Sequence, residues 1–370
     1  MKYHCYAACL FGMEKPVALE LEHLGIPVEQ VRDGRVFFMA DAQQIALANL
    51  HLRCADRVYL VLGEFEATSF EELFEGVQAI DFTEFIGKHT AFPVLGDCVQ
   101  STLMSVSHVQ SICKKAVVNS LQKRYRIGHF DEQGDKVQLY VNILRDKVTL
   151  CLNTSGPGLN RRGYRVFNAK APMRETLAAG LIFLSRWKDR EFYDIMCGSG
   201  TIAIEAAMKR KNMAPGSLRE FDAEKWGSQW NRAFVQARQA AKDQLLHPPA
   251  GCIHAYDIDP KCVEMTRLHA KKAGVAELMD IRQADAAQFD GGRENATILS
   301  NPPYGMRLME KEQAAQLMGQ VGRNLQKRED LRYYFISGDP QFERAFGKKC
   351  DKKRKLYNGN LLCYFYQYFR

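Results

Sequence analysis

From Glu191 to the C-terminus, strand-like apolar runs alternate with helix-like periodic segments, and this alternation constrains the fold more strongly than any other feature of the chain. Strands are predicted at 191–196, 252–259, 279–285, 296–303, 331–339 and 361–369, and helices at 201–210, 261–274 and 314–327. Strands that are joined through helices run parallel in one sheet, with helices on both faces. This part of the chain is therefore predicted to be a doubly wound, mostly parallel α/β domain of the Rossmann-like type.

The first half of the chain predicts two smaller α/β units. Its opening segment follows the order β-α-β-β-α-β of a ferredoxin-like fold, and Asp33-Gly34 is a typical turn for the central hairpin. The next unit has a predicted helix at 109–126 and a hairpin that turns at Arg145-Asp146-Lys147. We therefore divide the chain into a ferredoxin-like domain (1–66), a second α/β domain (67–155), a linker with one helix (156–190) and the doubly wound domain (191–370).

Two segments stand outside this scheme. The polar, glycine-rich run "SGPGLNRRGYRVFNAKAP" (155–172) is typical of a linker. An insertion at about 211–250 interrupts the alternation of the last domain and contains Trp226, Trp230 and a helical pattern. We expect this insertion to be a lid or a brace.

The composition narrows the cellular setting and the chemistry. The chain has 370 residues, 46% hydrophobic and 25% charged, as in ordinary globular proteins, and no apolar run approaches the length of a membrane span. Its 11 cysteines are scattered without paired CxxC spacing, which predicts free thiols, a cytoplasmic location and neither a zinc site nor disulfides. The formal charge of +8 suits a polyanionic partner but is also common among soluble proteins.

The glycine turn "DIMCGSGT" (Asp194–Thr201) lies between the first strand of the α/β domain and its first helix. Gly198 and Gly200 allow a tight turn and a close approach of the backbone to a ligand, and the helix N-terminus presents free N–H groups. Ligands of such sheets bind beyond the carboxyl ends of the strands. Because a GxG turn can also serve strand–helix packing alone, this motif leaves both interpretations open.

Acidic residues end the second and third strands of this domain. Asp257, in "AYDIDP", is placed to hold the ribose hydroxyls of a nucleoside ligand, and Asp285, in "QAD", can accept a hydrogen bond from an adenine amino group. Either acid can instead be a cap or a turn residue, since "DIDP" could simply start the helix at Lys261. Together with the glycine turn, the two acids converge on one crevice, and this convergence favours a nucleoside-containing ligand.

The motif "NPPY" (Asn301–Tyr304) follows the fourth strand and opens into the same crevice. An exocyclic amino group on a conjugated ring is a poor nucleophile, because its lone pair is delocalised. The Asn301 side-chain oxygen and the Pro302 carbonyl can accept hydrogen bonds from such a group and direct its lone pair at an electrophile, while Tyr304 stacks on the ring. A sulfonium methyl is an electrophile that needs neither a protein nucleophile nor a metal, and positioning supplies roughly 7–11 kcal/mol of the acceleration. The alternative is a Pro-Pro turn that only connects two elements.

The motifs "DIMCGSGTIAIEAA", "YDIDP", "QAD" and "SNPPYG" resemble the class I S-adenosylmethionine-dependent methyltransferases that modify exocyclic amino nitrogens. The runs "TSGPGLNRRGYRVFNAKAPMRETLAAGL", "VQSICKKAVVNSLQKRYR" and "KKRKLYNGNLLCYFYQY" resemble the bacterial THUMP-domain methyltransferases of the RlmL type, which make N2-methylguanosine in large-subunit (23S) ribosomal RNA. The resemblance covers essentially the whole chain. It implies that the second unit is a THUMP domain and the last a class I methyltransferase domain. Ile195 departs from the pattern, because many relatives have proline there.

The resemblance also implies the cofactor and the residues that contact it and the target base. The cofactor is S-adenosyl-L-methionine, released as S-adenosyl-L-homocysteine, and no metal takes part. The residues implied in cofactor binding are Asp194, Cys197, Gly198, Ser199, Gly200, Thr201, Asp257, Ile258, Asp285, Ala286 and Asn301. Asn301, Pro302, Pro303 and Tyr304 are implied at the target base.

The THUMP resemblance changes the interpretation of a group of cations. On charge alone, a run of basic residues on the predicted helix 109–126 is a solvated helix face, whereas in a THUMP domain an RNA-contacting role is favoured. The resemblance also places the stretch Arg161–Arg165, with Ala171-Pro172, along the cofactor or an entering RNA strand. The implied RNA-contacting residues are Lys114, Lys115, Lys123, Arg124, Arg126, Arg161, Arg162, Tyr164 and Arg165, and the expected partner is large-subunit ribosomal RNA or a pre-ribosomal particle.

Three other functions remain open from the sequence. DNA adenine-N6 methylation would use the NPPY loop equally well, although no recognisable DNA-reading helix motif appears in the first half. Methylation of a protein glutamine side chain is also within reach of such a loop, although it has little use for a basic RNA-docking half. The third alternative is a non-catalytic RNA-binding or assembly factor.

Overall fold

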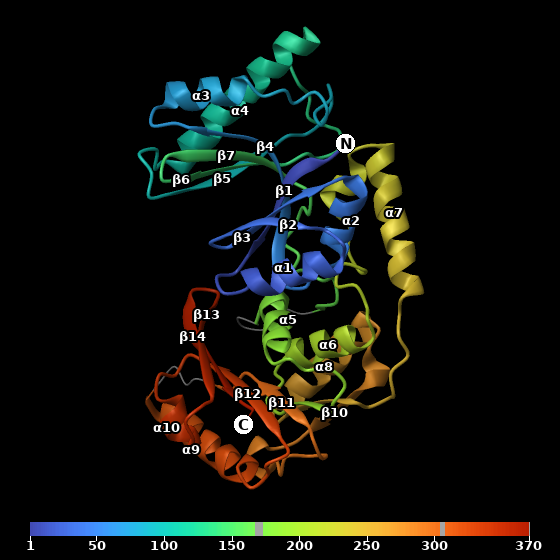
Figure 1. Cartoon of the computed structure of the whole chain (residues 1–370), viewed down its shortest axis with the longest axis vertical. Helices are drawn as coiled ribbons and strands as arrows, with labels where there is room; N and C mark the ends of the chain where they lie inside the picture. The colour runs from blue at the N-terminus through green and yellow to red at the C-terminus, as the bar shows by residue number, and fades with distance from the viewer. Residues whose placement is uncertain (167–172, 304–307, 370) are drawn as a thin grey trace.

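The strand β4 (Ala55–Glu66) joins the two N-terminal units into one sheet. In the computed structural model, which describes residues 1–166, 173–303 and 308–369, β4 pairs antiparallel with β1 (Tyr3–Cys9) on one side and with β7 (Lys147–Asn153) on the other. The resulting sheet has seven strands in the order β2-β3-β1-β4-β7-β6-β5. The two predicted units therefore share a continuous sheet rather than meeting through an exposed linker (Figure 1).

The ferredoxin-like unit has the predicted order of elements. The strands β2 (Val28–Arg32) and β3 (Arg35–Ala40) flank Asp33-Gly34, as expected, and pair antiparallel. Its two helices, α1 (Glu14–His23) and α2 (Ala42–His51), cover one face of the sheet, and Asp41 closes a capping box at the start of α2.

The second unit adds two helices and three strands to the same sheet. The predicted helix at 109–126 is α4 (Val106–Tyr125), which packs beside α3 (Phe70–Gln78). The predicted hairpin consists of β6 (Leu139–Leu144) and β7, and Arg145 and Asp146 have φ of 51° and 63° at its turn, as tight hairpin turns require. β5 (Val94–Val99) pairs parallel with β6 and ends the sheet.

The second sheet also has seven strands, in the order β10-β9-β8-β11-β12-β14-β13. The strands β8 to β12 pair in parallel, and β14 and β13 are added antiparallel at one edge. Chain order runs outward from β8 to β10 and then returns to β11 beside β8, so the switch point lies between β8 and β11. The bounds are β8 (Phe192–Asp194), β9 (Ile253–Asp257), β10 (Met279–Gln283), β11 (Thr297–Ser300), β12 (Arg332–Ser337), β13 (Lys352–Asn358) and β14 (Leu361–Tyr368).

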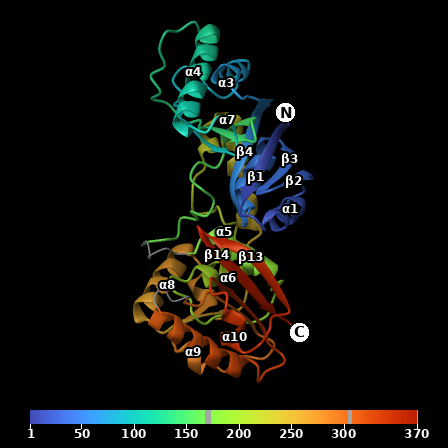
Figure 2. The ribbon, with the colours of Figure 1, turned by 90° about the vertical axis from the view of Figure 1, so that its left-hand side faces the viewer.

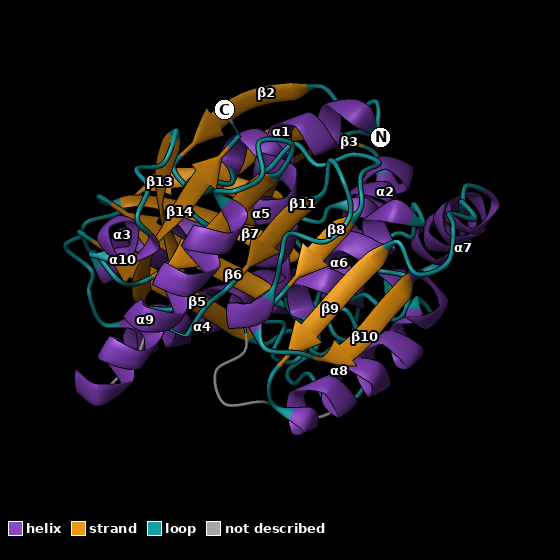
Figure 3. Ribbon diagram, turned by 90° about the horizontal axis from the view of Figure 1, so that it is seen from below, coloured by secondary structure: helices purple, strands orange, loops and turns teal. Residues whose placement is uncertain are grey.

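Helices cover both faces of this second sheet. Neighbouring residues of β12 point to opposite faces of the sheet. Tyr334 packs toward the helices α5, α6 and α8 on one face, and Tyr333 packs toward α9 and α10 on the other. The helices are α5 (Glu175–Leu184), α6 (Thr201–Arg210), α8 (Pro260–Ala273), α9 (Leu308–Leu325) and α10 (Phe342–Phe346). The predicted doubly wound α/β fold is confirmed. Figure 3 shows β8, β9, β10 and β11 side by side with their carboxyl ends at the same edge.

The insertion is a brace, not a lid. It contains the short 3-10 helix η1 (Asp222–Lys225) and the helix α7 (Ser228–Asp243), which runs along the ferredoxin-like unit beside α2 (Figure 1). The indole of Trp230 lies 5.8 Å from the ring of Tyr3 and 5.3 Å from that of Trp226. This aromatic contact attaches the last domain to the first one.

The connector after β7 does not behave as the expected exposed linker. Among its residues, Ser155, Leu159, Arg162 and Tyr164 are at most 2% exposed. The glycine-rich composition serves close packing here, since a Cβ at Gly163 would lie 2.4 Å from the carbonyl oxygen of Leu218. Among the described residues, no helix has the length and apolar character that a membrane span needs.

Candidate active site

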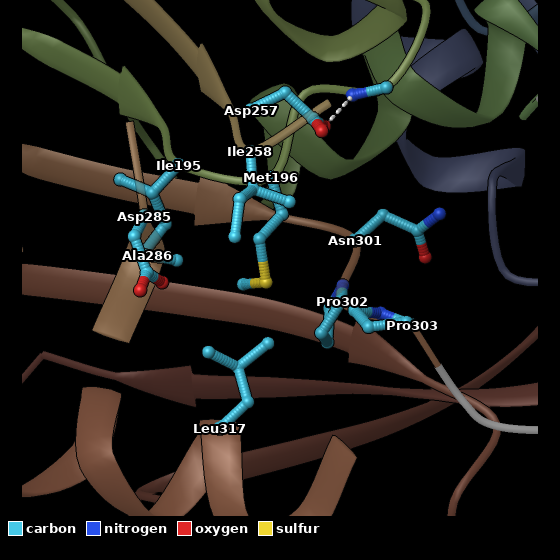
Figure 4. Close-up of a pocket in the computed structure, with 11 residues that line it drawn as sticks. Ile195, Met196, Asp257, Ile258, Asp285, Ala286, Asn301, Pro302, Pro303 and Leu317 are labelled. Carbon is cyan, nitrogen blue, oxygen red and sulfur yellow. Dashed lines mark hydrogen bonds between the residues drawn. The ribbon is translucent and has the colours of Figure 1, made fainter. Parts of the chain in front are cut away.

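A pocket of about 530 Å³ opens at the carboxyl ends of β8, β9, β10 and β11, next to the switch point. Figure 4 shows Asp285 and Ala286 on one side of this pocket, Asn301, Pro302 and Pro303 on the other, and Leu317 of α9 below. The lining residues are Ile195, Met196, Gly198, Asp257, Ile258, Asp285, Ala286, Asn301, Pro302, Pro303 and Leu317. Six of the predicted cofactor residues are among these eleven: Gly198, Asp257, Ile258, Asp285, Ala286 and Asn301.

The glycine turn has the backbone conformation that its sequence predicts. Gly198 has φ of 54° and Gly200 has φ of 81°, values that L side chains rarely adopt. A Cβ on Gly198 would meet no atom within 4 Å, whereas a Cβ on Gly200 would lie 2.6 Å from Cγ2 of Thr266. Gly198 therefore keeps the pocket open, and Gly200 allows the turn to pack against α8.

Asp257 holds the glycine turn from the end of β9. Its Oδ2 accepts a hydrogen bond from the Gly198 amide at 2.8 Å, and its Oδ1 accepts one from the Asp259 amide at 3.0 Å. Asp259 is the residue that caps α8, since its side chain accepts from the Lys261 amide at 2.8 Å. The two alternatives weighed for "DIDP" thus fall on different residues: Asp259 caps the helix, and Asp257 lines the pocket.

Asp285 combines both of the roles weighed for it. Its Oδ1 accepts a hydrogen bond from the Ala287 amide at 2.9 Å and caps the short helix η3 (Ala286–Gln288). The same residue and its neighbour Ala286 line the pocket. A carboxylate has about four acceptor sites, so this cap leaves acceptor capacity for a ligand.

Asp194 lies behind the glycine turn. Its side chain is 1% exposed and accepts a hydrogen bond at 2.8 Å from the hydroxyl of Ser300, which in turn accepts from the Ile195 amide at 2.8 Å. Burial raises the pKa of this carboxyl to about 7, although the Ser300 hydrogen bond lowers it. The chain Asp194–Ser300–Ile195 ties the end of β8 to the end of β11, where Asn301 begins the next loop.

The rest of the predicted cofactor motif surrounds the turn without lining the pocket. Cys197 is buried, and its amide donates to the Tyr256 carbonyl at 2.9 Å. Thr201 begins α6, and its hydroxyl accepts a hydrogen bond from Arg165 at 2.9 Å. Arg165 also lies 3.4 Å from the Ser199 hydroxyl and forms an ion pair with Glu175. Arg165, which the resemblance placed along the cofactor or the RNA strand, is a support of the glycine turn.

Two residues on α8 support the same turn. The Thr266 hydroxyl donates to the Gly198 carbonyl at 3.0 Å, and Nδ1 of His269 lies 3.0 Å from the Ser199 carbonyl. A carbonyl oxygen can only accept, so Nδ1 carries the proton. Burial lowers the pKa of His269 and favours the neutral ring, while the hydrogen bond to Ser199 selects the tautomer. Sequence reasoning missed both residues, although their i, i+3 spacing on the helix after "DIDP" was a usable signal.

The described part of the NPPY motif, Asn301 to Pro303, lies at the pocket as predicted. Asn301 and Pro302 follow β11 and line the pocket together with Gly198 and Asp257. Figure 4 shows the Asn301 carboxamide above Pro302 and Pro303. Tyr304 and the pair Ala171-Pro172 lie outside the described residues.

Burial overturns two of the predicted RNA contacts. Arg162 and Tyr164 are each 1% exposed and cannot reach an RNA strand at the surface. Arg162 pairs instead with Glu205 of α6, with Nε 3.1 Å from Oε1, and donates to the Arg53 carbonyl at 2.6 Å. Tyr164 packs in the core beside α5 and α6. Arg162 therefore links the last domain to the ferredoxin-like unit through the Arg53 carbonyl, and Glu205 balances its buried charge.

The cations of α4 divide into two groups. Lys114 is half-buried, pairs with Glu132 at 2.6 Å and donates to the Phe92 carbonyl at 3.0 Å, so it is a structural cation. The exposed cations are Lys115, Lys123, Arg124 and Arg126, together with Arg161 on the connector. These five retain the exposure that an RNA contact requires.

Three pocket residues carried no sequence assignment as ligand contacts. Ile195 and Met196 follow β8 and form the apolar wall beside the glycine turn, and Leu317 faces them from α9. Apolar residues in a strand end or a helix look like ordinary core residues, so no local pattern marked these three as ligand contacts. Among the described residues no group of three or more His, Cys, Asp or Glu side chains could hold a metal, and the 11 cysteines form no disulfide there.

The order of the second sheet and a pocket at its switch point define a class I methyltransferase domain. Three family models match the chain: an RlmL ferredoxin-like domain over residues 4–59, a THUMP domain over 67–153 and an RMKL-like methyltransferase domain over 162–367. The chain belongs to the RMKL-like methyltransferase family, with the ferredoxin-like and THUMP domains of the RlmL type, as the sequence motifs predicted.

Full-length relatives support this assignment. A Bacillus subtilis (strain 168) protein named "Putative RNA methyltransferase YpsC" is 39% identical over 376 residues, which cover 100% of this chain and 96% of that protein. A Listeria monocytogenes str. 4b F2365 crystal structure, named a predicted N6-adenine-specific DNA methylase, has a TM-score of 0.94 and 41% identity and covers 100% and 96% of the two chains. The structure of SMU.472, named a putative methyltransferase complexed with SAH, has a TM-score of 0.94 and 36% identity, with 100% and 98% covered.

Proposed function

We propose that this chain is an S-adenosylmethionine-dependent methyltransferase that acts on an exocyclic amino group of a base in RNA, and that its target is N2 of a guanosine in 23S ribosomal RNA. The observation that supports this best is a juxtaposition: Asn301 and Pro302 line the same pocket as Gly198, Asp257 and Asp285. The residues proposed to hold the nucleoside of the cofactor, Asp257 and Asp285, therefore line the same cavity as those proposed to hold the target amino group, Asn301 and Pro302 (Figure 4).

The residues of the pocket fit S-adenosylmethionine. Asp257 offers carboxylate oxygens for ribose hydroxyls, and Asp285 offers one for an adenine amino group, while Ile258, Ala286 and Leu317 supply apolar walls for a flat ring. Gly198 leaves open space where any side chain would project. The structure of SMU.472 complexed with SAH, a protein 36% identical to this chain, supports the same ligand class.

When bound, S-adenosylmethionine supplies a methyl group that is attached to a positively charged sulfur. The sulfur is the leaving group and keeps the electron pair of the carbon–sulfur bond. The Asn301 side-chain oxygen and the Pro302 carbonyl accept the two hydrogens of a target amino group. This hydrogen bonding draws the nitrogen toward tetrahedral geometry and makes its lone pair available, and the nitrogen later loses one proton to water. Catalysis then rests on orientation, for which roughly 7–11 kcal/mol is available.

The N-terminal domains favour RNA as the substrate. A THUMP domain precedes the catalytic domain, and the YpsC relative is named an RNA methyltransferase. Figure 2 shows α4, which carries Lys123 and Arg124, on the same side of the molecule as α8 and α9, which flank the pocket. We propose that Lys115, Lys123, Arg124, Arg126 and Arg161 contact the RNA backbone. Eleven free thiols fit a cytoplasmic enzyme.

DNA adenine-N6 methylation is the second candidate, because the Listeria monocytogenes relative is named for it. A competition experiment separates the two: purified protein receives tritiated S-adenosylmethionine with equal masses of ribosomal RNA and DNA. We expect label in RNA, as N2-methylguanosine by nucleoside mass spectrometry. Label that is confined to DNA, or that is found as N6-methyladenosine in RNA, contradicts the proposed target.

The role of Asn301 is tested in the same assay. Asn301→Ala removes one of the two proposed acceptors without touching the glycine turn or Asp257. Because Asn301 is only one of eleven implied cofactor contacts, we expect the affinity for S-adenosylhomocysteine by calorimetry to fall by at most a few fold, whereas turnover falls by roughly a hundredfold or more. Near-normal methyl transfer by this variant would rule out the proposed role.

A further inference from the structure

The positive charge of the chain is concentrated in one short segment of the catalytic domain. Of the eight residues at 348–355, six are Lys or Arg and one is Asp, in a chain whose formal net charge is +8. This segment leads into and includes most of β13, the edge strand of the second sheet. The cations of the segment are Lys348, Lys349, Lys352, Lys353, Arg354 and Lys355.

Most of these cations face solvent, while the strand itself is anchored. Lys349, Lys352 and Lys355 are exposed, whereas Leu356 is 1% exposed. A Cβ on Gly12 would lie 3.1 Å from Cδ2 of Leu356, so the strand rests against the turn between β1 and α1. The cations are therefore carried on a fixed element between two domains.

The two acids near this segment, Glu343 and Asp351, leave it with an excess of positive charge. Glu343 pairs with Lys353 at 3.5 Å and accepts a hydrogen bond from the Cys350 amide. Asp351 accepts one from the Phe369 amide at 2.7 Å. Lys353 also lies 4.4 Å and 4.7 Å from the ring centres of Tyr364 and Tyr366, which fix it in place. Lys349, Lys352 and Lys355 are then the exposed excess.

A groove between α9 and α10 continues the basic surface. It has a volume of about 500 Å³, and its charged lining residues are Arg323, Lys327 and Arg344, with no acid among the lining. All three are exposed. Gly347 ends this groove, and the segment 348–355 starts directly after it. Figure 2 shows α10 and the β13–β14 hairpin together on the face that is turned to the viewer.

Protection of the sheet edge explains only part of this pattern. Lysines on an edge strand prevent it from pairing with another chain. Protection of an edge strand needs only one or two charged side chains, of either sign, and it does not need a groove. A cluster of one sign that extends over a strand, a loop and two helices creates a positive field, and such a field attracts a polyanion.

We propose that the exposed cations of β13 and of the α9–α10 groove form a second RNA-docking surface, on the catalytic domain itself, that binds phosphates of the RNA substrate. Lys349, Lys352, Lys355, Arg323, Lys327 and Arg344 constitute this surface, which we call the basic edge. The inference rests on the proposed function, because it takes RNA as the substrate. The basic edge holds RNA that lies outside the pocket, so it sets affinity and not the chemical step.

The test compares two double charge reversals of equal size. Lys352→Glu with Lys355→Glu alters the basic edge, and Arg232→Glu with Lys242→Glu alters two exposed cations on α7, on the opposite side of the molecule in Figure 1. Neither pair touches the pocket. Binding of protein-free ribosomal RNA is measured at several salt concentrations, together with KM for RNA, kcat and S-adenosylhomocysteine affinity.

We expect the basic-edge variant to lose roughly tenfold in RNA affinity at 0.1 M salt. The slope of log K for RNA binding against log salt concentration should become less steep by about one to two. The KM of this variant for RNA rises accordingly, while kcat and S-adenosylhomocysteine affinity stay unchanged. The α7 variant should change RNA affinity by less than about twofold. Replacement of Lys352 and Lys355 by Arg should retain wild-type affinity, because the charge is kept.

The inference is overturned if both charge-reversal variants bind RNA equally well. It is also overturned if the loss appears only with ribosomal particles and not with protein-free RNA, since the surface would then meet a protein. Failure of the proposed function looks different, because the wild-type chain itself would neither bind nor methylate RNA.

Discussion

The hydroxyl of Thr266 donates a hydrogen bond to the carbonyl oxygen of Gly198 at 3.0 Å. One turn later on α8, His269 bonds to the Ser199 carbonyl at the same distance of 3.0 Å. In a trans peptide the C=O and the N–H point in opposite directions. With the Gly198 carbonyl directed at α8, the amide of the following residue, Ser199, points away from α8. The helix α8 thus determines how the glycine turn presents its backbone.

Thr266→Val is expected to weaken cofactor binding. Valine keeps the shape of threonine but leaves the Gly198 carbonyl without its partner, at a cost of about 1–3 kcal/mol. We expect the affinity for S-adenosylhomocysteine to fall by roughly fivefold to tenfold in calorimetry. Thr266→Ser keeps the hydroxyl and should stay near wild-type affinity. If the serine variant loses as much affinity as the valine variant, packing rather than the hydrogen bond is responsible.

Substitutions of Asp257 and Asp259 should have different effects, because Asp257 is proposed to bind the cofactor whereas Asp259 caps α8. Asp257→Ala removes the acceptor of the Gly198 amide and the proposed ribose ligand, so we expect S-adenosylhomocysteine affinity to fall by roughly tenfold to a hundredfold. Asp259→Ala removes the cap of α8 and should lower stability by about 1 kcal/mol with little change in affinity. Calorimetry and thermal unfolding of both variants check this division. Equal losses of affinity would show that the two acids do not have separate tasks.

The buried ion pair of Arg162 and Glu205 should be costly to break on one side only. Arg162→Met leaves the Glu205 carboxylate buried without its partner, and we expect a loss of about 3–5 kcal/mol, seen as a lower unfolding midpoint. The double change to Met at both positions should recover much of this loss. Arg161→Met is the matched control, since Arg161 is exposed and should change stability by less than about 0.5 kcal/mol. An Arg162→Met variant as stable as this control would contradict the assignment.

Asp194 should make stability depend on pH between about 4 and 7. The pKa of this carboxyl is raised from 3.8 to about 7 by burial, so between these values the folded state holds a proton that the unfolded state has released. Stability therefore decreases as pH rises through this window and levels off above it. Asp194→Asn keeps the acceptor for Ser300 and removes the titration. The difference in melting temperature between variant and wild type should grow with pH up to about 7, and a constant difference would contradict the raised pKa.

Local sequence patterns predicted the individual elements well, because their signals are local. The turn Asp33-Gly34 between β2 and β3 and the helix α6 lie where they were predicted, since glycine turns and helical periodicity act over a few residues. β13 was not predicted as a strand, because its run of Lys and Arg hides the alternation that buries Leu356. The fusion of the first two units through β4 also escaped prediction, since pairing with β7 joins residues far apart in the chain.

The candidate site shows the same division. Gly198, Asp257, Asp285 and Asn301 were identified because parallel strands bring their carboxyl ends to one edge, so that position in the sequence implies position in space. Arg162 was misplaced as an RNA contact, and the pairing of Arg165 with Glu175 was not predicted, because a cation in a glycine-rich run looks the same whether it faces solvent or a buried glutamate. That choice depends on Glu205 and Glu175, which reach the connector only through the packing of α6 and α5.

The alternation of apolar strand-like runs with helix-like segments thus determined the class of fold, and the polar residues after the strands determined the edge at which a ligand is expected to bind. The tertiary structure alone decided which cations form buried ion pairs and which are exposed to solvent. It also decided which helix holds the glycine turn in place. The reason is physical: turn and strand preferences are set by neighbouring residues, whereas burial, ion pairing and second-layer hydrogen bonds exist only once distant segments are packed together.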